Sequence, residues 1–262
     1  MSEPTVIAAG AGEIIGDAPD RRVEILSDDA TVNATWSRFA AGRDGADLHV
    51  HYHHSDLFYV LEGELTLRLG VEGETAAVPA GTLARVPPGV VHGFRNAGDA
   101  DMRYLNLHAP GQGFADYMRG LRDGRPILYD QHDPPDDGGR PTREAVIGGA
   151  EPLGEDATLL VDIEVIAIAE LRHAPGATPA AAHVRPAHVA SYYVLDGELA
   201  LTLDAGELRA AAGAWVQVPA GLEHFVAAGG GAPVRYLSLH TPGAGAGTLR
   251  SGVNQAWKPP LA

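Results

Sequence analysis

The stretch His49–Gly63 reads HVHYHHSDLFYVLEG and contains four histidines and one aspartate within its first eight residues. Imidazole and carboxylate groups are the ligands that borderline divalent metals prefer in proteins. Residues two apart on a strand project from the same face, so we expect His49 and His51 to point toward one centre. Asp56 follows a short turn and opens the next strand, from which its carboxylate returns toward that centre. The stretch therefore predicts a metal site built on neighbouring strands.

A second stretch, Gly81–Asn96, reads GTLARVPPGVVHGFRN, and the two stretches together resemble the two signature motifs of the cupin superfamily. The second motif keeps every spacing of the family pattern. Its fixed positions are Gly81, Pro87, Gly89, His92 and Asn96. The first motif is present with Asp56 in place of the usual glutamate. Its opening glycine is out of register, because Arg43 occupies that place.

The resemblance implies a metal held by three histidines and one acid in the first copy of the motifs. The implied ligands are His49, His51, Asp56 and His92. This set leaves two octahedral positions open and accommodates one divalent transition metal, Fe, Mn, Ni, Cu or Zn. His53 is an alternative ligand, because strand parity places it on the same face as His51. In some relatives the acid also acts as a base, which makes Asp56 the candidate catalytic residue.

The chain carries an internal repeat of one β-rich unit. The segment RYLNLHAPG from Arg103 recurs as RYLSLHTPG from Arg235, and Tyr59-Val60-Leu61 recurs as Tyr193-Val194-Leu195. Short alternating segments cut by Gly and Pro predict an all-β fold. The resemblance selects two tandem double-stranded jelly-roll (cupin) barrels, which we place at residues 1–148 and 149–262. An apolar stripe between them predicts one short helix. The stripe consists of Phe114, Tyr117, Met118 and Leu121.

The second copy lacks most of the metal motif. Arg185 stands where the first copy has His51, and Ala190 stands where it has Asp56. A cation beside an arginine and without a carboxylate is poorly held, so we expect no tightly bound metal there. The second barrel is then a structural partner, or its remaining polar groups form a small anion pocket. These groups are His183, Arg185, His188 and His224.

Strand parity also predicts the residues around the first site. If Asp56 faces the interior, Phe58 and Val60 share its face, and Phe94 follows two residues after His92. Walls of this kind suit an apolar or aromatic small molecule. His108 and His240 end the repeated strands, and their presence in both copies indicates a structural role.

Composition excludes several classes of protein. The chain has 262 residues, a formal net charge of −15 and no cysteine. An acidic surface opposes nucleic-acid backbones. The absence of cysteine excludes disulfides and cysteine nucleophiles. Without a secretory signal or an apolar stretch long enough for a bilayer, we expect a cytoplasmic protein with a small-molecule substrate and no membrane or nucleic-acid partner.

Two-barrel members of the superfamily include quercetinase-like and other ring-cleaving dioxygenases, oxalate-handling enzymes and seed storage proteins. The resemblance therefore implies a metal-dependent oxidoreductase of the dioxygenase type that acts on a small oxygen-bearing molecule in the first barrel. Alternatives are a metal-dependent isomerase of a sugar or keto acid, and a non-catalytic metal or small-molecule binding module. Family members often pair through their outer sheets, which is compatible with a homodimer.

Overall fold

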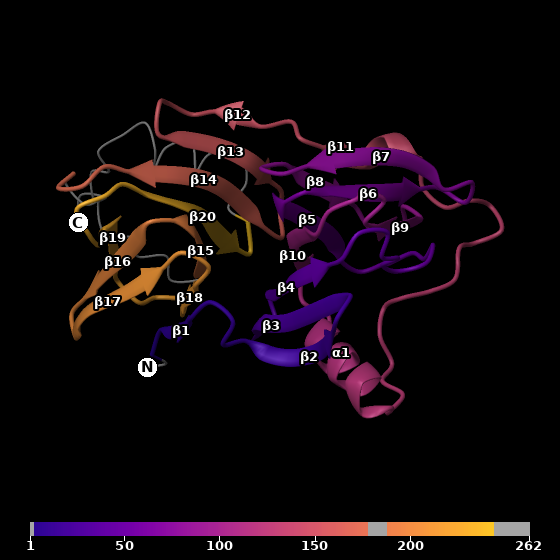
Figure 1. Ribbon diagram of the computed structural model, residues 1–262, viewed down its shortest axis with the longest axis horizontal. Coiled ribbons are helices and arrows are strands. Elements are labelled where there is room, and N and C mark those ends of the chain that lie inside the picture. Colours follow the sequence, from indigo (N-terminus) through magenta and orange to yellow (C-terminus); the bar gives the residue numbers. More distant parts are fainter. Residues whose placement is uncertain (1–2, 178–187, 244–262) are drawn as a thin grey trace. The chain divides into compact units, whose positions relative to one another are not determined.

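The computed structural model describes residues 3–177 and 188–243 and divides the chain into two compact units. The first unit is Glu13–Gly148, and the second combines Met1–Gly12 with Gly149–Ala262. In each unit a seven-stranded antiparallel sheet is accompanied by a three-stranded one (Figure 1). The predicted all-β architecture of two tandem jelly-roll barrels is confirmed.

The first unit is built from ten strands. Its larger sheet runs, in spatial order, β11 (Val146–Ile147), β8 (Leu83–Val86), β5 (Ser55–Glu62), β10 (Met102–Ala109), β4 (Val32–Phe39), β3 (Arg21–Asp29) and β2 (Glu13–Ala18). Its smaller sheet runs β7 (Glu74–Pro79), β6 (Glu64–Leu69) and β9 (His92–Arg95). In β6 the alternation ELTLRL buries Leu65, Leu67 and Leu69 in the barrel core, as a half-buried strand requires.

The second unit repeats this plan. Its larger sheet runs β1 (Thr5–Ile7), β18 (Trp215–Val218), β15 (Val189–Asp196), β20 (Val234–Thr241), β14 (Ala167–His173), β13 (Ala157–Asp162) and β12 (Glu151–Pro152). Its smaller sheet runs β17 (Gly206–Ala211), β16 (Glu198–Leu203) and β19 (Phe225–Ala228). Residues 1–148 were expected to form the first barrel alone. Instead β1 belongs to the second unit, because Val6 pairs with Val216 of β18.

The predicted helix is α1 (Phe114–Asp123), which packs against β2, β3 and β4 of the first unit (Figure 1). The backbone N–H of Ala115 donates to Asn33 Oδ1 at 3.0 Å and fixes the start of the helix to β4. Gly124 ends the helix in the left-handed conformation. The 3₁₀ turn η1 (Thr142–Glu144) follows later. Among the described residues, no helix has the length and apolar character needed to cross a bilayer.

Candidate metal centre

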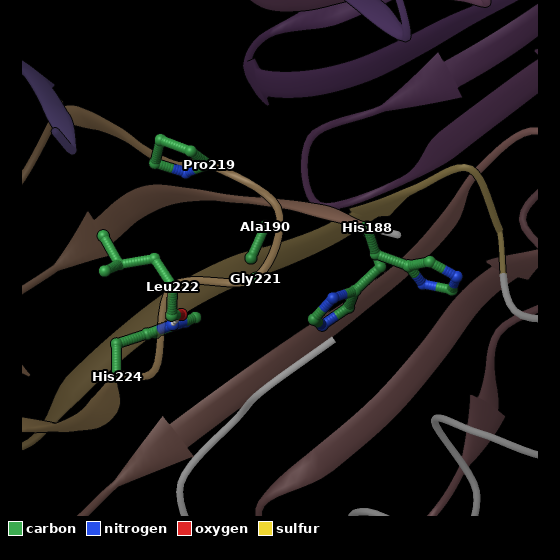
Figure 2. Close-up of a pocket in the computed structure, with 7 residues that line it drawn as sticks. His188, Ala190, Pro219, Gly221, Leu222 and His224 are labelled. Carbon is green, nitrogen blue, oxygen red and sulfur yellow. Dashed lines mark hydrogen bonds between the residues drawn. The ribbon is translucent and has the colours of Figure 1, made fainter. Parts of the chain in front are cut away.

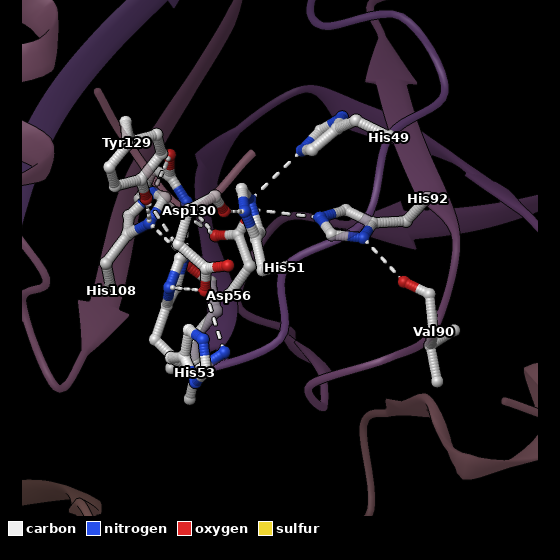
Figure 3. A network of polar contacts seen from close by, with 12 residues as sticks. His49, His51, His53, Asp56, Val90, His92, His108, Tyr129 and Asp130 are labelled. Carbon is white, nitrogen blue, oxygen red and sulfur yellow. Dashed lines mark hydrogen bonds and ion pairs between the residues drawn. The ribbon is translucent and has the colours of Figure 1, made fainter. Parts of the chain in front are cut away.

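The four side chains implied as ligands come together inside the first barrel. His49 and His51 lie on the segment before β5, Asp56 lies on β5, and His92 begins β9 (Figure 3). Reciprocal backbone hydrogen bonds of 2.8 and 2.9 Å join His49 to His92 and align the two segments. All four side chains are buried, and one ligand atom from each lies within 4.8 Å of the others.

Backbone carbonyls fix the tautomers of the three histidines. His49 Nδ1 donates to the carbonyl of Asp47 at 2.7 Å, and His92 Nδ1 donates to that of Val90 at 3.0 Å. His51 Nδ1 donates to the carbonyl of Asp130. Because a carbonyl oxygen only accepts, each proton sits on Nδ1 and each Nε2 presents a lone pair. The Nε2 atoms of His49 and His51 are 3.1 Å apart. Two lone pairs this close repel each other, and a cation bound by both nitrogens would remove that repulsion.

The two carboxylate oxygens of Asp56 have different neighbours. Asn106 Nδ2 donates to Oδ1, while Oδ2 lies 3.2 Å from His92 Nε2 and 4.0 Å from His51 Nε2. Burial raises the pKa of Asp56, but the neighbouring His108, His92 and His51 outweigh it, and the pKa lies below its usual range. A weak base of this kind is better suited to hold a metal than to accept a proton near neutral pH.

Burial keeps the imidazoles of His49 and His51 neutral, which is the form that binds metals. It lowers the pKa of His49 to about 4 and also lowers that of His51. Neutral imidazoles beside an ionised carboxylate are the donor set that a divalent transition metal requires. The residues present therefore fit such a metal.

A second layer of polar groups, which includes Tyr129 and Asp130, contacts the residues around this set (Figure 3). The carboxylate of Asp130 accepts from His54 Nδ1 at 3.1 Å and from the backbone N–H of His53 at 2.7 Å. Tyr129 Oη lies 2.9 Å from His54 Nε2 and 2.7 Å from His108 Nδ1. These contacts connect the segment after α1 to the segment that carries the candidate ligands His49 and His51.

The same layer reaches Asp56 through Asn106. His108 Nε2 donates to Asn106 Oδ1 at 3.0 Å, which turns the amide nitrogen of Asn106 toward Asp56 Oδ1. Such outer partners orient ligands and tune metal affinity. Sequence reasoning gave His108 only a structural role. It missed Asn106, Tyr129 and Asp130, because the site is marked in the sequence by its histidine cluster and these three residues lie outside that cluster.

The alternative ligand His53 does not join the group, because its side chain is exposed. Strand parity placed it beside His51, but residues 52–54 form a bend rather than a strand, so that parity does not apply. His54 is the buried neighbour instead.

A cavity of about 330 Å³ opens beside the candidate ligands. Its wall includes His49, His51, Asp56 and, as predicted, Phe94. Phe58 and Val60, the other predicted pocket residues, belong to the packed core rather than to the cavity wall. Both face inward, but the ring of Phe58 is covered by those of Phe94 and Tyr104, at centroid distances of 5.1 and 6.2 Å.

The four stripe residues of α1 also line this cavity, so the helix forms part of its wall. They are Phe114, Tyr117, Met118 and Leu121.

Part of the degenerate site of the second barrel is among the described residues. His188, Ala190 and His224 line a pocket of only about 10 Å³, shown in Figure 2. His224 Nδ1 donates to the carbonyl of Leu222 at 2.9 Å, and the hydroxyl of Tyr192 donates to His224 Nε2 at 2.6 Å. The nitrogen that matches the candidate ligand of His92 is therefore already occupied. His183 and Arg185, also predicted for this site, lie outside the described residues.

Two tandem jelly-roll barrels with a buried histidine and aspartate cluster define a bicupin. The profile of the cupin domain family matches residues 35–108 and 169–240, more than half of the chain. The chain therefore belongs to the cupin family. The comparison with curated proteins gives no significant match.

Solved structures similar to this chain share its fold at low sequence identity. Protein Ylba from E. coli is 17% identical, with a TM-score of 0.64 over 91% of this chain and 90% of its own. A putative glyoxylate induced protein from Pseudomonas aeruginosa is 21% identical, with a TM-score of 0.65 over 91% and 89%. Oxalate decarboxylase from Bacillus subtilis is 16% identical, with a TM-score of 0.64 over 94% and 79%.

Proposed function

We propose that the first barrel binds one divalent transition metal and acts as an oxidoreductase of the dioxygenase type on an oxygen-bearing organic molecule. The proposed ligands are His49, His51, Asp56 and His92. One observation carries the proposal: three imidazole nitrogens with their protons fixed elsewhere and one ionised carboxylate converge beside a cavity.

The residues of the chain would bind and orient the substrate. Held by the four ligands, the metal would supply Lewis acidity and, if it is iron or copper, electron transfer to and from oxygen-bearing ligands. Phe39, Phe94 and Phe114 give the cavity apolar walls that exclude water around a substrate. Asn106 would hold Asp56 in the ligand orientation through the hydrogen bond to Oδ1.

The names of the similar structures are compatible with this class of chemistry. One is an oxalate decarboxylase and another is a putative glyoxylate induced protein. Fold likeness at 16 and 21% identity carries no reaction with it, so the reaction must be tested on this chain directly.

The test is metal content together with oxygen consumption. Protein purified without a metal-affinity tag should contain about one transition metal per chain, from the count of one complete donor set. His92→Ala should lose this metal, whereas His53→Ala, which removes an exposed histidine of the same segment, should keep it. Iron-loaded or copper-loaded protein should then consume oxygen with an enol or phenol substrate.

The other outcomes separate the alternatives. Turnover without oxygen consumption would support a metal-dependent isomerase in place of the dioxygenase. Metal binding without turnover of any tested compound would leave a binding module. Absence of metal from wild-type protein after reconstitution would contradict the proposed centre itself.

A further inference from the structure

One cationic side chain lies in the cavity wall, away from the candidate ligands. Arg21, the first residue of β3, is partly buried and is the one lysine or arginine that lines the cavity in the described part of the chain. Its neighbour Arg22 pairs with Glu24 at 2.7 Å and with Asp17 at 3.4 Å. For Arg21, no ion pair to a carboxylate occurs within residues 3–177 and 188–243.

The guanidinium of Arg21 has room because of a glycine on the neighbouring strand. A Cβ atom added to Gly16 of β2 would lie 3.2 Å from Arg21 Nη2 and 3.5 Å from Nε. The positive charge also acts on the hydroxyl of Tyr104, which lines the same cavity: burial raises the pKa of Tyr104, and Arg21 opposes that rise. The charge of Arg21 therefore acts on a side chain of the cavity wall, that of Tyr104.

Strand register places this charge far from the candidate metal. Arg21 pairs with Phe39, while Asp56 pairs with His108, which pairs in turn with Asn33. Phe39 lies six positions beyond Asn33 on β4, which is about 20 Å of strand. The guanidinium turns back toward Gly16, whose strand partner Val23 is two residues nearer to the ligands. The remaining span is on the order of 10 Å.

The wall between these two ends is largely apolar. Val23, Phe39, Phe94 and Tyr104 line it, and Thr35 and Ser37 of β4 add hydroxyl groups. A ligand that touches both ends thus needs a charged group for the arginine, an apolar or aromatic body, and an oxygen atom for the metal. Arginine matches a carboxylate with two parallel hydrogen bonds, and a partly desolvated guanidinium without a partner gains most from such a ligand.

We propose that Arg21 binds the carboxylate of an extended organic acid whose opposite end carries the oxygen that reaches the metal centre. This deepens the proposed function and rests on it for the metal-bound end only. A two-carbon acid such as oxalate is too short to touch both ends. The substrate class is therefore an aromatic or medium-length acid with an enol, phenol or carbonyl oxygen far from its carboxylate.

The test is calorimetric titration of zinc-loaded protein, in which the metal is redox-inert. The probes are para-hydroxycinnamate, its neutral methyl ester, and octanoate with a hydroxyl at its far end. Wild-type protein should bind at least one of the two acids, and para-hydroxycinnamate about tenfold or more tightly than its ester, as expected for a charge-assisted pair. Arg21→Gln should remove that preference and leave ester binding unchanged, while Arg21→Lys should recover part of it.

Arg103→Gln is the matched control, because Arg103 lies on β10 and pairs with the exposed Glu62 outside the cavity. It should keep the preference for the acid. Equal binding of acid and ester by wild-type protein, binding of neither acid, or equal losses in Arg21→Gln and Arg103→Gln would overturn the proposal.

Repeating the titration on metal-free protein separates the two claims. If the acid still binds more tightly than its ester and Arg21→Gln abolishes the difference, the arginine site stands even where the metal proposal fails. If metal binds at the expected stoichiometry but the acid preference does not depend on Arg21, only the arginine site fails.

Discussion

Replacing Asn106 by alanine should weaken metal binding without touching a ligand. Asn106 Nδ2 donates to the buried carboxylate of Asp56, and Asn106 Oδ1 accepts from His108 Nε2 at 3.0 Å. The first bond involves a charge and contributes about 1.5–3 kcal/mol, and the second, between neutral groups, about 1 kcal/mol. We expect the free energy of unfolding of metal-free protein to fall by about 3 kcal/mol. Loss of a partner behind a ligand should lower zinc affinity about 10–100-fold.

The assay is competition with a chelator for zinc affinity, alongside urea denaturation for stability. Asn96→Ala is the matched control, because Asn96 is buried away from the candidate ligands and its amide donates to the carbonyl of Ala40 at 2.9 Å and that of Ala100 at 2.8 Å. It should lose stability yet keep its zinc affinity. The reasoning would be refuted if Asn106→Ala bound zinc as wild type does, or if both variants lost affinity equally.

Two further predictions concern stability. Burial lowers the pKa of His49 to about 4 and that of His108 to about 3, so on acidification the unfolded chain takes up protons before the folded chain does. The free energy of unfolding of metal-free protein, measured in urea, should therefore be highest above about pH 6.5 and fall progressively toward about pH 4. A flat profile would contradict this. Gly63→Ala should cost about 1–3 kcal/mol, because Gly63 has a φ of 74° and an added Cβ would lie 2.7 Å from the carbonyl of Asp101. Gly42, at a φ of 67° with open space around it, is its control: Gly42→Ala should cost less, and equal thermal shifts would show that the contact contributes nothing.

Much of the fold follows from local pattern. The strands Glu64–Leu69 and Leu83–Val86 show this, because alternation and flanking Gly and Pro, the pattern from which the all-β fold was predicted, define both. The strand expected to carry His49 and His51 is reduced to isolated bridges of His49 and Val50. The pairing of β1 with the second unit depends on a partner about 200 residues away, which no local pattern specifies.

In the candidate site, too, local pattern predicts some residues and not others. The motifs predicted His49, His51 and His92 because metal ligands need fixed residue types at fixed spacing. The outer layer has no such requirement: Asp130 reaches His54 across 76 residues, from a segment without strand or helix periodicity. Arg21 was also missed, because an arginine at the start of a strand has the same sequence pattern whether it faces a cavity or solvent.

The most direct test of the metal centre is the anomalous difference map of crystals grown from protein loaded with zinc or iron. The account predicts one strong peak per chain, in the first barrel, among Nε2 of His49, His51 and His92 and Oδ2 of Asp56. A strongest peak beside His188 and His224 of the second barrel, or the absence of a peak from fully loaded protein, would contradict it.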